Sequence, residues 1–264
     1  MRTARIPRAF REISGGPTTK EPALMTNESS RHPFGLSTGD QVLVVAPHPD
    51  DETIGPGGTV ARLAAAGIGV HVLCVTVRAA KMWGSHSDPN TRLAEFETAC
   101  KALGVTTQTI AWVDETGDLD ITVKQRDLVN LIEKHEECSL SAVRPKALII
   151  PAAGGYHQDH QAVFRAAFAA ARIQGPGLKP TPKTVLGYRG VEDRWSADSE
   201  PWWVHVDTSA HWGDKEEALR AYGTQMRPGN QPRSLNHVRT IDAATGGSHC
   251  WEYGESFVPY RMSW

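Results

Sequence analysis

The stretch that decides the fold is QVLVVAPHPDDETIGPGG, residues 41–58. Residues 42–45 are a short apolar run rich in β-branched side chains, which is typical of a strand buried on both faces. A polar turn follows at residues 47–52, and residues 57–67 (GGTVARLAAAG) predict a helix that ends at Gly67. A buried strand, a turn and a helix are the first part of a βαβ unit.

The same alternation continues along the chain, because further apolar runs are each followed by a segment with helical periodicity. The expected strands are residues 70–77, 109–113 and 147–151, and the expected helices are residues 91–103, 122–137 and 159–172. Strands that alternate with helices of this length form parallel sheets. We therefore expect an α/β fold, with a Rossmann-like, mostly parallel sheet and helices on both faces.

The two ends of the chain do not follow this alternation. Residues 1–38 lack periodicity and predict an irregular N-terminal arm, whereas residues 39–264 predict a single domain. The last third contains two expected strands, one expected helix and a stretch rich in Pro, Gly and Asn that predicts loops: residues 184–188, 202–206, 214–222 and 227–250. The domain is therefore expected to carry a loop-rich C-terminal elaboration.

Composition excludes several classes of protein. Of 264 residues, 40% are hydrophobic and 22% are charged, which fits a globular protein with a substantial core. A net charge of −2 disfavours nucleic acid as a partner, because phosphate binding needs a basic surface. No apolar run has the length of a membrane span, and the basic start lacks the apolar core of a secretory signal. Four scattered cysteines without a CxxC pair predict reduced thiols in a cytoplasmic protein, and nothing in the composition predicts an oligomeric state.

The polar turn after the first expected strand carries residue types that bind metal ions. His48 and Asp51 are three residues apart, so a tight turn can direct both side chains to one point. Asp50 lies between them in sequence and cannot point in the same direction, so it is available for a role other than metal binding. Two adjacent carboxylates repel each other unless a cation lies beside them, which favours a divalent metal. The same acidic residues would also suit a helix N-terminus without any metal.

A second polar turn, GGYHQDH at residues 154–160, follows the fourth expected strand. The carboxyl ends of parallel strands lie at one edge of the sheet, so the two turns are expected to meet there. His48, Asp51 and His160 would then supply three nitrogen and oxygen ligands and leave a position for water, as in catalytic zinc sites.

Such a site would support hydrolysis of an amide. A bound metal lowers the pKa of its water to about 7 and polarises a carbonyl oxygen. Asp50 is placed to act as the general base and His157 as the general acid for the departing amine. Asp159 is the expected hydrogen-bond partner that keeps His157 protonated.

The two motifs together resemble those of the PIG-L/LmbE-like family of zinc-dependent N-acetylglucosaminyl de-N-acetylases. PHPDDE at residues 47–52, followed by IGPGGT, and HQDH at residues 157–160 carry the resemblance, which extends from about residue 40 to the C-terminus. KEEALRAYGTQ at residues 215–225 and GESF at residues 254–257 resemble the family's late helix and closing segment.

The resemblance implies a cofactor, a substrate class and a role for each residue. It implies Zn²⁺ held by His48, Asp51 and His160, with Asp50 as base, His157 as acid and Asp159 as its orienting carboxylate. The implied substrate is an N-acetylglucosamine-type amino sugar on a larger glycoconjugate, and an antibiotic-biosynthesis member acting on a glycosylated intermediate fits the departures described next.

Three positions depart from the family pattern. Related enzymes often carry Gly-Glu after the second strand, where this chain has RAAKMW at residues 78–83. Gln158 replaces a common proline, and Tyr222 replaces a common histidine. These departures concern the substrate more than the chemistry. Beside the motifs, Tyr156 is expected to be structural rather than an oxyanion donor, and Arg92 is expected to pair with a glutamate three residues on, on a solvated helix face.

Three alternatives use the same features. A non-haem Fe(II) enzyme would use two histidines and one carboxylate as ligands, but those sites usually lie in all-β folds. A nucleotide-binding Rossmann module would need a glycine fingerprint where this chain has HPDDE. An inactive, metal-bearing carbohydrate-binding protein would keep the ligands without the turnover.

Overall fold

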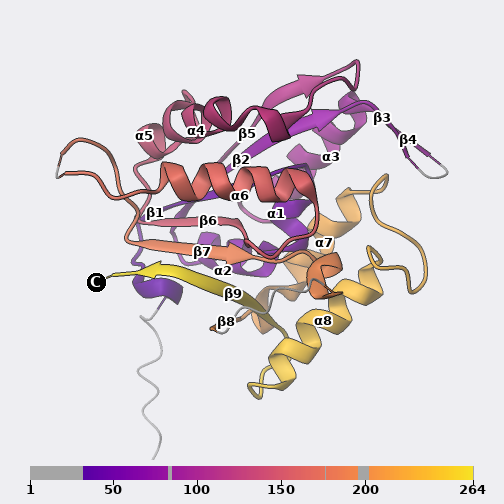
Figure 1. Cartoon of the computed structure of the whole chain (residues 1–264). Helices are drawn as coiled ribbons and strands as arrows, with labels where there is room; N and C mark the ends of the chain where they lie inside the picture. Colours follow the sequence, from indigo (N-terminus) through magenta and orange to yellow (C-terminus); the bar gives the residue numbers. More distant parts are fainter. Residues whose placement is uncertain (1–31, 83–84, 176, 196–201, 264) are drawn as a thin grey trace, which may run out of the picture. The chain divides into compact units, whose positions relative to one another are not determined.

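A sheet of seven strands forms the centre of the part of the chain that the structure describes, residues 32–82, 85–175, 177–195 and 202–263 of a computed structural model (Figure 1). In spatial order the strands are β5 (Thr107–Asp114), β2 (Gly69–Arg78), β1 (Gln41–Ala46), β6 (Ala147–Pro151), β7 (Thr184–Tyr188), β9 (Gly254–Met262) and β8 (Val204–Asp207). The first five run parallel, and β9 is antiparallel to both of its neighbours. The predicted mostly parallel sheet is confirmed.

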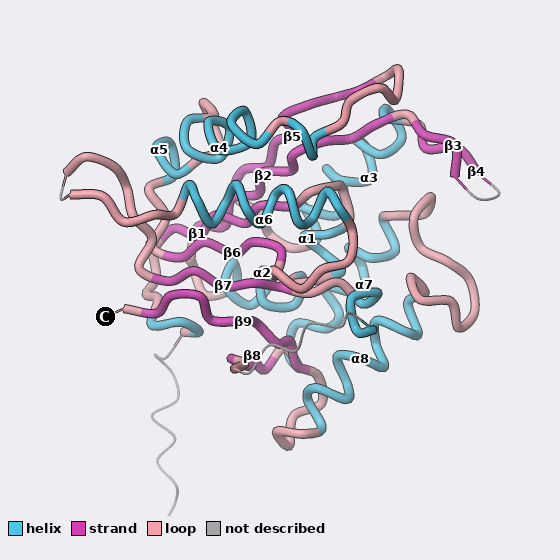
Figure 2. The backbone as a smooth tube through the Cα atoms, in the orientation of Figure 1, coloured by secondary structure: helices cyan, strands magenta, loops and turns pink. Residues whose placement is uncertain are grey.

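Alternate side chains of β1 enter two separate cores, one on each face of the sheet. Val42 and Val44 pack in one core, and Leu43 and Val45 pack in the other. The first core includes residues of α2 (Gly57–Ala65), α3 (Pro89–Ala102) and α7 (Trp212–Ala221), and the second includes residues of α4 (Gln125–Lys134), α5 (Leu140–Val143) and α6 (Gln158–Ala170). Figure 2 shows α4, α5 and α6 together over one face. The apolar run in β1 is continuous because both faces of the strand are buried.

The order of the strands reverses its direction at β1. The chain passes from β1 to β2 on one side, whereas β6 pairs with β1 on the other side. In open α/β sheets the loops that follow two such strands diverge, and ligands bind between them at the carboxyl edge. Here the loop after β1 leads into the short helix α1 (Asp51–Ile54), and the loop after β6 leads into α6. These two junctions are the predicted metal-binding turns.

The C-terminal third contains more regular structure than predicted. The prediction of loops over residues 227–250 is wrong for α8 (Leu235–Gly247). Ser234 caps the N-terminus of this helix, because its hydroxyl accepts a hydrogen bond from the His237 amide at 3.1 Å. The buried residues of α8 are Val238, Asp242 and Gly246. Because only one of them is a large apolar residue, the helix lacks the apolar stripe from which a helix is predicted. Strand β9 and the hairpin β3 (Ala80–Met82) and β4 (Ser85–Ser87) were also not anticipated.

The expected N-terminal arm falls mostly on residues 1–31, which lie outside the described residues. Its last part includes a 3₁₀ turn, Pro33–Gly35, whose Phe34 ring packs edge-on against Phe257 at a centroid distance of 5.7 Å. Within the described residues, no helix has both the length and the apolar character needed to cross a membrane.

Candidate metal centre

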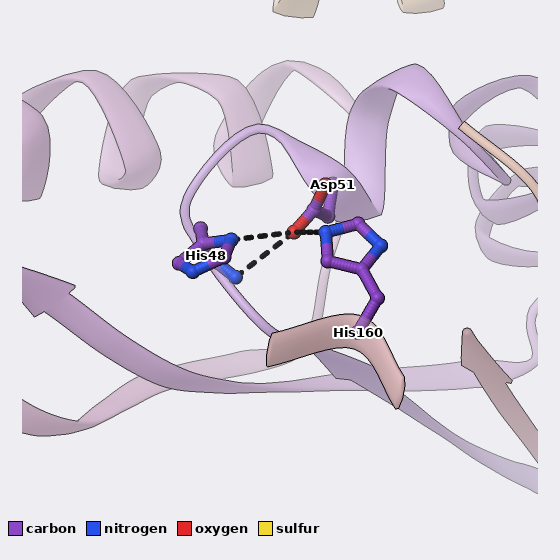
Figure 3. A group of neighbouring side chains, drawn as sticks. All are labelled: His48, Asp51 and His160. Carbon is purple, nitrogen blue, oxygen red and sulfur yellow. Dashed lines mark hydrogen bonds and ion pairs between the residues drawn. The ribbon is translucent and has the colours of Figure 1, made fainter. Parts of the chain in front are cut away.

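His48, Asp51 and His160 come together at the carboxyl edge of the sheet. His48 lies in the loop after β1, Asp51 is the first residue of α1, and His160 lies in the first turn of α6 (Figure 3). The three side chains point toward one another although more than a hundred residues separate the two turns. The sheet order produces this meeting, as expected from the sequence.

The distances within this cluster fit a tetrahedral metal site. The Oδ2 atom of Asp51 lies 3.3 Å from Nδ1 of His48 and 3.2 Å from Nε2 of His160. Ligand atoms that lie about 2.0–2.1 Å from a tetrahedral zinc ion are about 3.3 Å apart. The backbone N–H of His48 also donates to Asp51 Oδ2 at 3.0 Å, which fixes the turn. The donor set of two imidazoles and one carboxylate therefore suits zinc.

Asp159 supports His48 rather than His157. Its Oδ2 atom lies 2.9 Å from Nε2 of His48, on the side of the ring away from Asp51. A carboxylate behind a metal-binding imidazole fixes the ring and its tautomer. The structure differs here from the expected pair: His157 Nδ1 accepts a hydrogen bond from the Asp159 backbone N–H at 3.2 Å, which caps α6, and the described contacts include no hydrogen bond between the two side chains.

The charges of these groups are strongly coupled. Burial lowers the pKa of His48, but its hydrogen bonds to Asp159 and Asp51 outweigh this effect and raise it to about 9. Burial raises the pKa of Asp51, but the charge of His160 and the hydrogen bonds from both histidines hold it well below the usual range. Burial and the charges of His48 and His160 lower the pKa of His157 to about 4. A metal ion would displace the proton of His48, so binding should release protons.

Asp50 is buried beside the cluster in a strained conformation. It is 1% exposed, and its φ of 114° lies in the left-handed region that disfavours a side chain. Its Oδ2 atom faces Arg233 Nη1 at 3.4 Å and Arg92 Nη2 at 3.7 Å. Burial raises the pKa of Asp50, and the two guanidinium groups only partly offset that rise. A buried carboxylate with a raised pKa is suited to accept a proton.

Arg92 is a residue that the sequence argument misplaced. The predicted solvated pair between Arg92 and Glu95 is wrong: Arg92 is buried and donates to the carbonyl of Pro49, whereas Glu95 accepts hydrogen bonds from Thr224. Arg92 lies four residues before the buried Phe96 on the inner face of α3, and this helical spacing was a signal that could have located it.

Two other residues near the site had no clear sequence signal. Arg233 lies in the loop before α8, far along the chain from both motifs, and its Nε atom is 3.3 Å from Glu192 Oε2. Arg78 ends β2, and its Nη2 atom is 3.9 Å from Asp159 Oδ2. Tyr156 is 41% exposed and donates to Glu192 at 3.0 Å, and its structural role stays a prediction.

Comparisons with known proteins point to one family. Residues 43–171 match the PIG-L family model, described as GlcNAc-PI de-N-acetylase. A probable N-acetyl-alpha-D-glucosaminyl L-malate deacetylase 2 from Bacillus cereus is 31% identical over 137 residues, which cover 49% of this chain and 60% of that protein. A 1D-myo-inositol 2-acetamido-2-deoxy-alpha-D-glucopyranoside deacetylase 1 from Saccharopolyspora erythraea is 27% identical over 251 residues, covering 73% of this chain and 80% of that protein.

A solved structure agrees with this result. The conserved protein TT1542 from Thermus thermophilus superposes with a TM-score of 0.64 at 26% identity, over 84% of this chain and 95% of that chain. The matched family region, residues 43–171, contains both turns that carry the clustered histidines and carboxylates. The chain therefore contains a PIG-L family domain.

Proposed function

We propose that this protein is a metal-dependent amidohydrolase that removes the N-acetyl group from an N-acetylglucosamine-type amino sugar on a larger glycoconjugate. The observation that carries the proposal is the cluster of His48, Asp51 and His160, whose ligand atoms all lie within 4.8 Å of one another beside the buried Asp50. The names of both relatives describe removal of an acetyl group from an amino sugar, which supports the same reaction class.

Each residue of the cluster has a role in this reaction. His48, Asp51 and His160 would hold Zn²⁺, which when bound makes hydroxide available near neutral pH and polarises the amide carbonyl. Asp50 would take the proton of the attacking water.

Two further side chains would assist. His157 would donate a proton to the departing amine nitrogen, and the negative charge of Asp159 favours the protonated imidazole against the two neighbouring histidines. Asp159 would also hold the His48 ring in its binding orientation.

The relatives share the amino sugar but differ in what it is attached to. One name specifies malate and the other myo-inositol, so the common part is the N-acetylglucosaminyl group. We propose a glycosylated antibiotic intermediate as the carrier, because the family's usual residues are replaced near the site, for example at Arg78 and Gln158. The four cysteines are free thiols, which supports a reaction in the reducing cytoplasm.

Acetate release tests the proposal. The purified protein is stripped with a chelator, reloaded with Zn²⁺ or Fe²⁺, and assayed with N-acetylglucosaminyl glycosides. We expect acetate release only after reloading, and from Zn²⁺-loaded protein without any need for oxygen. No acetate from any glycoside after zinc reloading would contradict the proposed hydrolase and favour a binding protein, whereas an oxygen-dependent reaction of the Fe²⁺ form alone would favour the non-haem iron alternative.

A further inference from the structure

A cavity of about 150 Å³ lies beside the metal-ligand cluster, on the side of Asp50. Arg78 at the end of β2, Arg92 of α3 and Arg233 of the loop before α8 line it, together with His48 and His157. We call it the arginine pocket. Three guanidinium groups from three distant parts of the chain converge there, next to the residues proposed to act on the amide.

The three guanidinium groups are incompletely paired by the protein. Arg78 lies 3.9 Å from Asp159, whereas Arg92 and Arg233 lie 3.7 Å and 3.4 Å from the same oxygen of Asp50. Charge-assisted hydrogen bonds of arginine are usually about 2.7–2.9 Å long and often bidentate. Asp159 is also hydrogen-bonded to His48, and the second carboxylate near Arg233, Glu192 at 3.3 Å, also accepts from Tyr156. The carboxylates are therefore shared, and the arginines keep donor capacity beyond these contacts and the hydrogen bond from Arg92 to the Pro49 carbonyl.

Four residues of the same cavity lining each hold a buried polar atom without a partner. Thr76 Oγ1, Ser87 Oγ, Arg92 Nε and Gln225 Oε1 are buried and have no hydrogen-bond partner within the described parts of the chain. Each such atom costs about 1–3 kcal/mol, so several of them around one cavity require an explanation. The two hydroxyls and the Arg92 N–H can all donate to an anion, and the Gln225 oxygen can accept from a hydroxyl or amide group of the same ligand.

The lining of the pocket carries an excess of positive charge. Among the described residues that form it, Asp50 is the single carboxylate, whereas three residues of the lining carry a guanidinium group. Arg78 is the most accessible of the three, because its side chain is 35% exposed, compared with 24% for Arg233 and 11% for Arg92. A partly exposed guanidinium beside unpaired donors attracts an anion and can bind it with two parallel hydrogen bonds.

We propose that the arginine pocket binds an oxyanion of the substrate, a carboxylate or a phosphate, so that the preferred glycoconjugate is acidic near the amino sugar. This inference rests on the proposed deacetylase function and specifies its substrate class. Arg78 meets the anion at the mouth, and Arg92, Thr76 and Ser87 supply donors deeper in the cavity. The incomplete ion pairs of the arginines are then completed by the substrate.

The test compares three N-acetylglucosamine derivatives with the zinc-loaded enzyme: the neutral methyl glycoside, the carboxymethyl glycoside and the 1-phosphate. We expect kcat/KM for at least one acidic derivative to exceed that of the methyl glycoside by about tenfold or more, the size of one charge-assisted contact. The derivative with the larger preference identifies carboxylate or phosphate as the anion. The Arg78→Gln variant should lose most of this preference through an increase in KM for the acidic derivative.

Arg172→Gln is the matched control, because Arg172 is half-exposed and pairs with Glu133 at 3.1 Å, outside the pocket lining. It removes the same charge and should keep the wild-type preference. Equal kcat/KM for neutral and acidic derivatives, or a preference that Arg78→Gln and Arg172→Gln reduce equally, would overturn the inference while leaving the deacetylase function intact. If no derivative releases acetate, the proposed function itself fails.

Discussion

The arginine pocket and the ion cluster around Lys215 are two regions where charges are buried, and they are built in opposite ways. Lys215 is fully buried in α7, and its Nζ atom lies 2.7 Å from both Asp242 and Glu255. Glu255 also accepts the backbone N–H groups of Gly58 and Thr59 at 2.8 Å. In the pocket, by contrast, the nearest guanidinium nitrogen lies 3.4 Å from Asp50.

The difference separates charges that hold the fold from charges that are available for a ligand. The cluster joins α7, α8 and β9 to the N-terminus of α2, close behind the metal-binding turn, and its ion pairs are short. Asp50 and its arginines have longer contacts, a strained backbone and neighbouring unpaired polar atoms. Complete pairing indicates a structural role, and incomplete pairing beside a cavity indicates a site that a ligand completes.

The largest expected effect concerns Asp50. Asp50→Asn keeps the shape of the side chain but cannot take a proton, so kcat should fall about 10²–10⁴-fold. The free energy of unfolding should fall by less than in Lys215→Met, because the ion pairs of Asp50 with Arg92 and Arg233 are longer than those of Lys215. Acetate release and urea denaturation measure the two effects. Asp214→Asn, at a half-exposed position, is the control, and wild-type turnover in Asp50→Asn would remove Asp50 as the base.

The opposite result is expected for Lys215. Lys215→Met leaves two carboxylates buried without their cation and should lower the free energy of unfolding by about 3–5 kcal/mol. Lys146→Met is the matched control, because Lys146 makes an equally short 2.7 Å ion pair with Asp40 at a partly exposed position and should cost less than about 1 kcal/mol. Urea denaturation gives both values. Equal losses in the two variants would contradict the structural role of the buried cluster.

A smaller effect is expected when the Asp159 side chain is changed. The result shows whether this carboxylate acts on His48 or on His157. If Asp159 acts by holding His48, Asp159→Asn should weaken zinc binding about 10–100-fold. Competition with a chromogenic chelator measures the affinity. Unchanged zinc affinity with reduced turnover would instead assign the effect of Asp159 to His157, as the sequence argument expected.

The smallest effect concerns the pH dependence of stability. Burial lowers the pKa of Lys215, but the charges of Asp242 and Glu255 outweigh this effect and raise it above its ordinary value. Above about pH 10 the unfolded chain loses this proton while the folded protein keeps it, so the stabilisation is lost as pH rises through the folded pKa. Urea denaturation between about pH 9 and pH 11 should give a steeper decline for wild type than for Lys215→Met. Parallel declines would contradict the raised pKa.

The sequence predicted the parts of the molecule that depend on local pattern. The apolar run in β1 and the two polar turns were enough to predict the sheet and the meeting of His48 with His160, because strand order follows from βαβ connections. Helix α8 was missed because its buried face is small and polar, and β9 because an antiparallel partner from the end of the chain has no local signal. The roles of Asp50, His157 and Asp159 stay predictions.

The arginine pocket was beyond the sequence argument for a different reason. Arg233 reaches Asp50 across 183 positions of sequence, and no spacing rule relates them. The side-chain partner of Asp159 was equally undetermined, because His48 and His157 are both near its carboxylate and only the packed structure selects His48. Long-range contacts between side chains from loops depend on tertiary packing and leave no periodic pattern in the sequence.

The central claim is that one metal ion is held between the two turns, and zinc content in His160→Ala tests it most directly. His211→Ala, in which a partly exposed histidine outside the cluster is removed, is the matched control. After zinc loading and dialysis, elemental analysis should find one zinc per chain in the wild type and in His211→Ala, and almost none in His160→Ala. Full zinc occupancy in His160→Ala would contradict the account.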